Sequence, residues 1–322
     1  MSGTVALVTG ASRGIGRAIA RALGETRATV YVTGRTVASE IPPEPGTIEH
    51  VARDVDRLGG HGIAVRCDHE HPDEIGALFA KVASESGQLD LLVNNVHSGM
   101  PDLVAGVGRP FWETDPAVWE RMNGPGLRGH YVAAVHAARL MVPARRGLIV
   151  NVSSFCAGGY LLSVPYGVGK AALDRMTADL AHELLPHGVA VVSVWPGLVR
   201  TDTTGAVFHE AAPRYRRILD AYGETPERTG RAVAALASDP RVLRHSGRAL
   251  IAAEVMRDYR VFDDDGRYPP SPRSLTTLAS ALLPDRFRPL AALVPPVRVP
   301  RFVVARVLTR FSDHLRARGG FK

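Results

Sequence analysis

Apolar runs alternate with helix-length stretches through the first two thirds of the chain. Six runs rich in valine, isoleucine and leucine are expected strands: Val5–Val8, Thr29–Val32, Ile63–Arg66, Leu89–Val93, Leu148–Val152 and Val189–Val194. The helices expected between them include Ile15–Leu23, Asp73–Ser84, Pro116–Leu140 and Tyr166–Leu185. Strands that alternate with helices pair in parallel, and strands that are apolar throughout are typical of a sheet with both faces covered. The pattern therefore predicts an α/β fold, a three-layer α/β/α sandwich with a doubly wound parallel sheet.

The character of the chain changes after residue 262. A last short strand is expected near 247–251, and from Pro269 to Pro300 recurrent prolines break the sequence into short pieces. We therefore expect one Rossmann-type domain over residues 1–262 and a proline-broken extension over residues 263–322. Residues 286–322 hold eight arginines and one lysine against one acid, so the rest of a chain with net charge +7 is about neutral. This charge matches no nucleic-acid recognition motif, and we expect no nucleic-acid partner.

Composition places the protein among soluble intracellular chains. It is 45% hydrophobic and 22% charged, and its two cysteines, Cys67 and Cys156, lie too far apart in the sequence for a CxxC motif. No apolar run reaches the roughly 18 residues that a membrane-spanning helix needs. The first apolar run begins at Val5, which leaves no room for a signal peptide. We expect a cytoplasmic protein.

A glycine-rich turn follows the first expected strand and precedes the first expected helix. Gly10 permits a tight turn, Gly14 a close approach of the backbone to a pyrophosphate, and Gly16 close packing of helix on strand. The N-terminus of the helix offers free N–H groups and a positive dipole end to phosphates. In isolation the glycines also fit an ordinary turn, but their place between strand and helix indicates a dinucleotide site.

Six motifs in order resemble the short-chain dehydrogenase/reductase family over about residues 3 to 262. They are Gly10-x3-Gly14-x-Gly16, Asp68, Asn94-Asn95, Ser153-Ser154, Tyr166-x3-Lys170, and Pro196-Gly197 before Thr201. The resemblance implies reversible reduction of a carbonyl to an alcohol with a nicotinamide cofactor, in a homodimer or homotetramer. The residues at 126–131 and 164–170 are most similar to the subgroup of dehydrogenase/reductase member 1. That subgroup also has a C-terminal extension, with a motif similar to 298–301.

Tyr166 and Lys170 are four residues apart and therefore share one face of a helix. Because an adjacent ammonium favours the phenolate, we expect Lys170 to bring the pKa of Tyr166 down from its usual ~10. A hydroxyl at the end of the fifth strand can hold a carbonyl oxygen on which charge develops. Counting along the strand from Asn151 favours Ser154, whereas the usual family spacing favours Ser153. We assign catalysis to Tyr166, Lys170 and Ser154.

The resemblance also implies a set of cofactor-binding residues. They are Gly10, Ser12, Arg13, Gly14, Ile15, Gly16, Arg35, Asp68, His69, Asn95, Tyr166, Lys170, Pro196, Gly197, Val199 and Thr201. Asp68 would contact the adenine region, and Asn95 with Thr201 would place the nicotinamide half. Gly34 stands where an NAD-specific site needs a carboxylate, and Arg35 can pair with a 2′-phosphate, with Arg13 close enough to assist. We expect NADP(H) to be preferred over NAD(H).

Two positions depart from the family pattern. The helix asparagine that usually holds a proton-relay water should fall seven residues after Trp119, where this chain has Gly126. Asn123 lies one turn earlier and either replaces it or is an ordinary asparagine on the helix surface. His97 stands where the family usually has glycine, and it either points into the substrate space or is structural. The absence of the family asparagine also leaves open a non-catalytic dinucleotide-binding regulator as an alternative to an enzyme.

A metal site is not expected at His69 and His71. Pro72 and Asp73 fit better as the first turn of a helix, with proline at the first position and an acid facing the dipole.

The substrate pocket is expected to be apolar. The residues expected to shape it include Phe155, Tyr160, Leu161 and Leu162, which suggests a bulky apolar ketone or aldehyde. A basic amphipathic helix is expected over 302–315, and it either packs on the protein or lies on an anionic membrane as a peripheral contact. In both cases the prolines from 284 to 300 would hold this helix away from the mouth of the active site.

Overall fold

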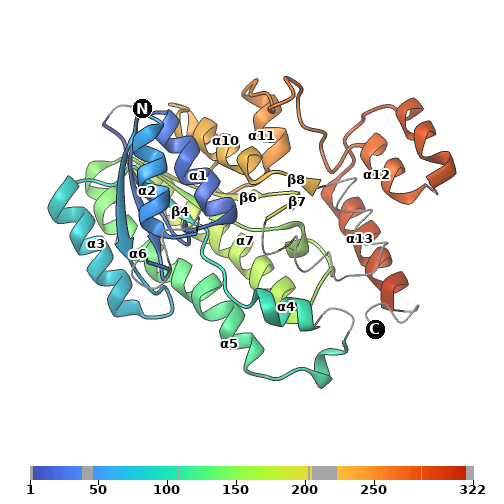
Figure 1. Cartoon of the computed structure of the whole chain (residues 1–322), viewed down its shortest axis with the longest axis horizontal. Coiled ribbons are helices and arrows are strands. Elements are labelled where there is room, and N and C mark those ends of the chain that lie inside the picture. Colours follow the sequence, from blue (N-terminus) through green and yellow to red (C-terminus); the bar gives the residue numbers. More distant parts are fainter. Residues whose placement is uncertain are drawn as a thin grey trace.

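A computed structural model describes residues 3–37, 46–106, 109–201, 204, 223–283 and 285–316. Its centre is a parallel sheet of seven strands in the order β3-β2-β1-β4-β5-β6-β9 (Figure 1). The strands are β1 Val5–Val8, β2 Thr29–Gly34, β3 His61–Arg66, β4 Leu91–Asn94, β5 Gly147–Val152, β6 Val189–Trp195 and β9 Ala249–Ile251. The order reverses between β1 and β4, and crevices at such points bind ligands in doubly wound sheets. The predicted fold class is confirmed.

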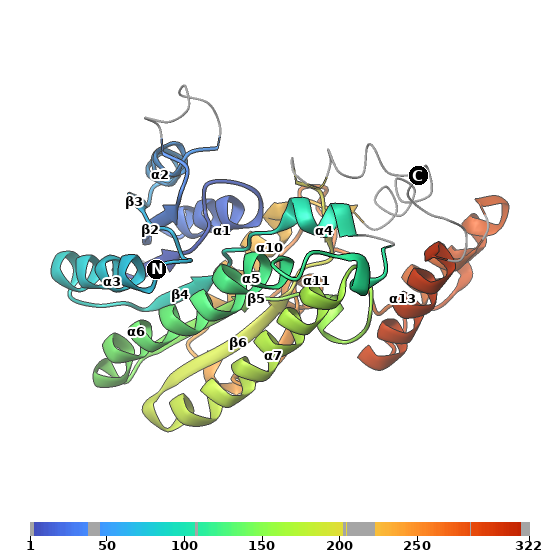
Figure 2. The same ribbon diagram turned by 90° about the horizontal axis from the view of Figure 1, so that it is seen from below.

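Helices cover both faces of the sheet (Figures 1 and 2). One face carries α1 Gly14–Glu25, α2 Ile48–Arg57, α10 Pro226–Ala237 and α11 Ala252–Asp258, and the other carries α3 Pro72–Ser86, α6 Gly129–Ala144 and α7 Val164–Leu184. Each layer buries its own apolar core against the strands. Local signals set the helix starts, since Pro72 opens α3 and the Ser163 hydroxyl accepts from the Tyr166 N–H at the start of α7.

The helix predicted over Pro116–Leu140 is interrupted in the structure. It consists of α5 Val118–Asn123, a π-helical turn over Gly124–Arg128, and α6. Gly124-Pro125-Gly126 supplies the reason, because proline lacks an N–H for the α-helical bond and glycine disfavours a regular helix. The π turn lies beside the candidate site described below.

Short elements connect the sheet to its surroundings. They are α4 Met100–Gly106, η1 Phe111–Glu113, η3 Phe155–Ala157, η4 Leu185–His187 and η5 Val242–His245, with a second small sheet of β7 Leu198–Val199 and β8 Gly223–Glu224. The Arg121 guanidinium binds Asp102 of α4 at 2.7 Å and Asp115 at 3.1 Å. These pairs fix α4 and the turn after η1 to α5.

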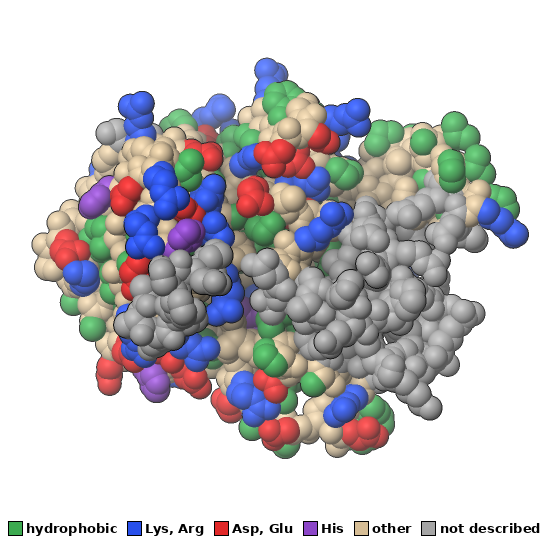
Figure 3. Space-filling view, viewed as in Figure 1, with side chains coloured by type: hydrophobic (Ala, Val, Ile, Leu, Met, Phe, Trp, Pro, Cys, Tyr) green, Lys and Arg blue, Asp and Glu red, His purple; other side chains and the backbone are tan. Residues whose placement is uncertain are grey.

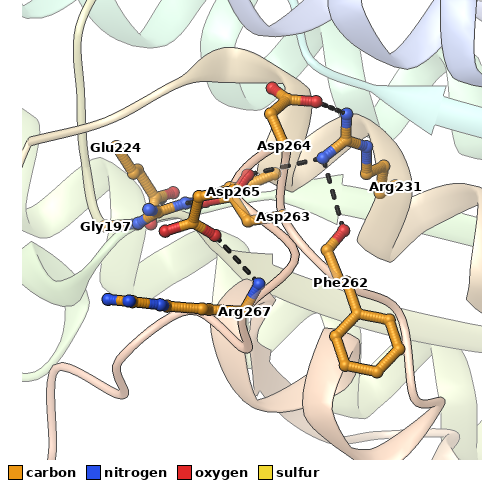
Figure 4. Close-up of polar contacts among 9 residues, drawn as sticks. Gly197, Glu224, Arg231, Phe262, Asp263, Asp264, Asp265 and Arg267 are labelled. Atoms are coloured by element: carbon orange, nitrogen blue, oxygen red, sulfur yellow. Dashed lines mark hydrogen bonds and ion pairs between the residues drawn. The ribbon is translucent and has the colours of Figure 1, made fainter.

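The chain turns sharply where the extension begins. The Asp263 carboxylate binds Arg228 of α10 at 2.5 Å and Arg231 at 3.4 Å, and Asp264 also pairs with Arg231 (Figure 4). The N–H of Asp263 donates to the carbonyl of Arg267 at 2.9 Å and closes the turn. The first residues beyond 262 are therefore bound to the Rossmann body, and a domain boundary at 262 stays a prediction.

The extension folds back onto the body. It holds α12 Leu275–Leu282, η6 Asp285–Leu293 and α13 Arg301–Arg316. The Arg273 guanidinium forms two hydrogen bonds to Glu254 of α11, at 2.9 and 2.6 Å. The Arg301 guanidinium lies 5.1 Å from the Trp195 ring centre at the end of β6, and Val304 is 3% exposed. These contacts fix the near end of α13 to the end of the sheet.

The position of α13 corrects one prediction. A side chain added at Gly158 or Gly159 would meet Ala305 of α13 at 3.6 or 3.0 Å. This glycine pair follows η3 in the loop after β5, so the prolines do not hold the helix away from the site. Val304 and Ala305 are buried, as expected if this helix packs on the protein and does not lie on a membrane. The side chains of Phe311 and Leu315 lie outside the described part. Within that part, no helix is long and apolar enough to cross a membrane.

Candidate active site

The glycine turn lies at the carboxyl edge of the sheet, between β1 and α1. Gly10 and Gly14 have positive φ angles of 62° and 55°, which favour glycine. A Cβ at Gly10 would lie 2.7 Å from the Val96 Cα, and one at Gly16 would lie 2.4 Å from the Gly10 carbonyl oxygen. The predicted roles of turn and close packing thus fit Gly10 and Gly16. Gly14 begins α1 and is partly exposed, which fits its predicted role in letting the backbone approach a pyrophosphate.

Asn95 braces this turn from the end of β4. Its Nδ2 donates to the carbonyl oxygens of Thr9 at 2.9 Å and of Gly10 at 3.0 Å, and its own N–H donates to the Thr9 hydroxyl. Both amide protons of Asn95 are therefore used by the glycine turn. The role of Asn95 at the nicotinamide half, which the family resemblance implies, stays a prediction.

Two serines follow β5, and their side chains face different partners. The Ser153 hydroxyl is buried and donates to the Lys170 carbonyl at 3.3 Å. The Ser154 hydroxyl accepts from the Cys156 N–H at 3.0 Å and lies close enough to the Tyr166 phenol to lower the pKa of that phenol. Of the two candidates, Ser154 is the one beside the Tyr166 phenol. The extended backbone at the end of the strand turns successive side chains to opposite sides, which separates the two serines.

Lys170 is buried one turn along α7 from Tyr166. Its side chain is 8% exposed, and its Nζ donates to the Val152 carbonyl at 2.9 Å. The Nζ lies 5.8 Å from the centre of the Tyr166 ring. Burial disfavours the charged ammonium and lowers the pKa of Lys170 to about 8. The group therefore changes its charge within a working pH range.

The pKa of Tyr166 moves in the opposite direction from the prediction. Burial raises it, the neighbouring Cys156 raises it further, and the nearby Ser154 hydroxyl opposes both effects. Desolvation is the largest effect, and the Lys170 ammonium donates to the Val152 carbonyl at 2.9 Å, with its Nζ 5.8 Å from the centre of the Tyr166 ring. In the cofactor-free protein Tyr166 is thus a neutral phenol, a form that can give up a proton.

Arg35 follows β2 at the same edge of the sheet. It is 60% exposed, and its Nη1 lies 3.6 Å from Asp68 after β3. The Arg13 guanidinium reaches across from the glycine turn and donates to the Thr36 hydroxyl at 3.3 Å. Two guanidinium groups therefore flank the end of β2, where no carboxylate follows Gly34 directly.

His69 is placed by the structure beneath this edge. Its side chain is 2% exposed, and its Nε2 lies 3.0 Å from the Thr33 hydroxyl. Burial lowers its pKa to about 4, so the ring is neutral. The imidazole is therefore directed into the protein, and a contact with a cofactor is left to the backbone of His69. The described residues hold no cluster of three or more potential metal ligands.

Pro196 and Gly197 follow β6, and sequence reasoning missed the residue that holds them. The buried Glu224 carboxylate of β8 accepts from the Gly197 N–H at 2.8 Å (Figure 4). Burial raises the pKa of Glu224 to about 7. Val199 lies in β7 beside β8, and the Thr201 methyl would lie 3.3 Å from a Cβ at Gly14. Thr201 thus reaches over the glycine turn. No local pattern marks Glu224, because 27 residues separate it from Gly197.

Asn123 is buried between α5 and α7, and not on a helix surface. It is 8% exposed, and its Nδ2 donates at 3.3 Å to the carbonyl of Pro165, which directly precedes Tyr166. A Cβ at Gly169 would lie 2.0 Å from the Asn123 Oδ1, so only glycine fits there. Asn123 therefore fixes the start of α7 by a direct contact.

A cleft lies between the α4–η1 segment and the start of α7. It is lined by Asp102, Arg109, Phe111, Arg121, Met122, Tyr160, Ser163 and Pro165, among others. Of the residues predicted to shape the pocket, Tyr160 lines this cleft. Phe155 instead packs edge to face on Trp195, at 5.0 Å between ring centres, beside the extension. The cleft reaches the residues immediately before Tyr166 and is the candidate substrate entrance.

The arrangement defines a dinucleotide-dependent oxidoreductase, and comparison with known proteins agrees. The family model for short chain dehydrogenases matches residues 4–212. The chain belongs to the short-chain dehydrogenase/reductase family and is an NAD(P)-dependent dehydrogenase/reductase.

Individual relatives resolve the subgroup. The chain is 41% identical to human dehydrogenase/reductase SDR family member 1 over 97% of this chain and 99% of that protein, an alignment that includes the extension. The mouse protein of that name is 43% identical over 83% of this chain and 85% of its own length. These identities confirm the predicted subgroup. The crystal structure of a metagenomic short-chain oxidoreductase in complex with NADP matches with a TM-score of 0.59 and 32% identity, covering 74% of this chain and 92% of that one.

Proposed function

We propose that the protein reduces a carbonyl compound to an alcohol, reversibly, with NADP(H) preferred over NAD(H). The observation that carries the proposal is the placement of the Ser154 hydroxyl near a neutral Tyr166 phenol, with the buried Lys170 one turn along the same helix. When bound, the nicotinamide cofactor supplies or accepts the hydride. In the direction of reduction, Tyr166 gives its phenol proton to the substrate oxygen.

Ser154 and Lys170 act on either side of this proton transfer. The Ser154 hydroxyl holds the substrate oxygen as negative charge develops on it. The Lys170 ammonium orients the cofactor ribose and stabilises the Tyr166 phenolate that is left, because an opposite charge nearby favours the ionised form. The phenolate then regains a proton from solvent.

The preference for NADP(H) rests on the end of β2. Gly34 leaves no carboxylate that would accept a hydrogen bond from a ribose hydroxyl, and Arg35 with Arg13 offers two cations for a 2′-phosphate. The surface nearby is basic as well, and Figure 3 shows basic side chains gathered over α1 and α2, which contain arginines and no lysine. The ion pair of Arg35 with Asp68 is long and exposed, so Arg35 can turn to a phosphate at little cost.

The glycine turn, Asp68, the backbone of His69, Gly197 and Thr201 complete the proposed cofactor site. The substrate is a bulky, mainly apolar ketone or aldehyde that enters by the cleft at Tyr160. A homodimer or homotetramer is supported by apolar side chains at the surface of α6 and α7, where Tyr131 is 53% and Val168 46% exposed. We place the protein in the cytoplasm, with peripheral membrane contact by α13 as the lesser alternative to packing.

Cofactor oxidation tests the proposal. The purified protein is incubated with NADPH or NADH and a panel of ketones and aldehydes, and the loss of reduced cofactor is followed by its absorbance. We expect turnover of apolar carbonyls with NADPH, and none by a Tyr166→Phe variant that still binds NADPH. A protein that binds NADPH but turns over no carbonyl would support the non-catalytic regulator instead.

A further inference from the structure

His97 lies directly beside the catalytic tyrosine. It follows β4 by three residues, and the centre of its ring is 5.3 Å from the centre of the Tyr166 ring, with the planes tilted by 41°. The Nδ1 of His97 would be only 3.4 Å from a Cβ at position 126. The glycine that replaces the family asparagine thus leaves the space that the histidine ring takes.

The other ring nitrogen has no partner. The Nε2 of His97 is shielded from solvent, and none of the described residues lies within hydrogen-bonding distance of it. A buried nitrogen without a hydrogen bond destabilises the folded state, and in native proteins such an atom usually has a ligand or a water molecule as its partner. The neighbouring His130 uses its Nε2 on the Val96 carbonyl at 2.9 Å, while its buried Nδ1 also lacks a partner; His97 differs in that its ring lies against the catalytic phenol.

The ring is uncharged. Burial lowers the pKa of His97 to about 3, and the nearby Lys170 ammonium acts in the same direction. A neutral imidazole has one N–H donor and one acceptor nitrogen, so it can bind either a carbonyl or a hydroxyl oxygen. Because the ring is not protonated at neutral pH, it cannot serve as a general acid, but it can form hydrogen bonds to a ligand.

We propose that His97 binds a second oxygen of the substrate, on a carbon close to the carbonyl that Tyr166 and Ser154 hold. The inference rests on the proposed carbonyl reduction and makes its substrate class narrower. The preferred substrates are ketones with a neighbouring hydroxyl or carbonyl group on an otherwise apolar body. The reason is that the centres of the two rings are 5.3 Å apart, so a molecule held at the phenol would lie next to the imidazole, and its second oxygen would supply the partner that the Nε2 lacks.

A pair of nearly isosteric ketones tests the inference. Propiophenone has one carbonyl, and 1-phenylpropane-1,2-dione has a second oxygen where propiophenone has a methylene group. The kcat/KM of each is measured with NADPH for the wild type, for His97→Phe, which keeps a ring but has no nitrogen, and for His97→Gln, which keeps a donor and an acceptor. The ratio between the ketones, compared between variants, cancels their different intrinsic reactivity.

We expect His97→Phe to lower the ratio of kcat/KM for the dione to kcat/KM for propiophenone by on the order of tenfold, because kcat/KM for the dione falls. His97→Gln should restore part of this ratio. Thermal unfolding shows whether each variant is folded. If His97→Phe does not fold, the ketone ratio of His97→Gln is compared with that of the wild type instead. An unchanged ratio overturns the inference. An equal loss with both ketones also overturns it, because it assigns His97 to the proton transfer or to the packing of Tyr166.

Two further readouts separate the inference from the proposed function. In the cofactor-free protein, NMR of labelled histidines should show His97 as a neutral ring from pH 5 to pH 8, and titration near 6.5 would contradict the enclosed site. If Tyr166→Phe keeps the activity with both ketones, the proposed function is wrong. If activity depends on Tyr166 but the ketone ratio does not depend on His97, only the present inference is wrong.

Discussion

Val304 allows a sharp test of how α13 is held. It is 3% exposed, whereas Phe302 in the same helix is 65% exposed, so the two positions form a matched pair. Val304→Ala removes two carbons, worth about 0.8 kcal/mol each in lost burial, and the cavity left behind brings the total to about 2 kcal/mol. For a domain of this size about 2–4 °C of Tm corresponds to each kcal/mol, so the expected fall is about 4–8 °C.

The assay is thermal unfolding followed by far-ultraviolet circular dichroism, with vesicle sedimentation in parallel. Phe302→Ala should leave the Tm nearly unchanged, because most of that side chain is in solvent. Deletion after Pro300 should lower the Tm more than Val304→Ala, since it also removes the Arg301 guanidinium from Trp195. The packing argument is refuted if Val304→Ala leaves the Tm unchanged while Phe302→Ala abolishes binding to anionic vesicles at low salt.

Four further outcomes are expected. Tyr166→Phe should abolish hydride transfer and leave the Kd for NADPH within a few-fold, and a variant that keeps most of its turnover would remove the catalytic assignment. Arg35→Ala should weaken NADPH far more than NADH, by about 10- to 100-fold in kcat/KM, since it removes a charge-assisted bond to the 2′-phosphate; equal losses with both cofactors would contradict this. Lys170 has a pKa lowered by burial to about 8, so kcat/KM for NADPH should fall as the pH rises through that value and the ammonium loses its proton. A profile flat to pH 9.5 would show that its charge is not needed. Asn123→Ala leaves the Pro165 carbonyl without its partner and should lower the free energy of unfolding by about 1–3 kcal/mol, seen as a lower Tm, and should lower kcat as well. An effect on Tm alone would restrict Asn123 to folding.

The catalytic pair and the glycine turn could be predicted because each depends on local spacing. The four-residue separation of Tyr166 and Lys170 fixes their common helix face, and a glycine turn between a strand and a helix has few other uses. The choice between Ser153 and Ser154 could not be made this way. The choice of serine depends on which side chains at the end of β5 face α7, and only the packing of β5 against α7 determines this.

Contacts between distant segments were likewise beyond the sequence. Glu224 reaches Gly197 and Asn123 reaches Pro165 across 27 and 42 residues. The direction of the Tyr166 pKa shift was mispredicted for the same reason, because spacing gives the nearest charge but not the depth of burial, and desolvation was the larger effect.

The sequence by itself determined the class of fold, the order of its elements and the edge of the sheet at which the site lies. Apolar periodicity distinguishes strands from helices, and parallel strands bring their carboxyl ends to one edge whatever the loops do. Only the tertiary structure decided that α13 packs beside the loop after β5 and that the His97 ring takes the space left by Gly126. Both depend on the shapes of surfaces that meet after folding, and no repeat or spacing along the chain encodes such shapes.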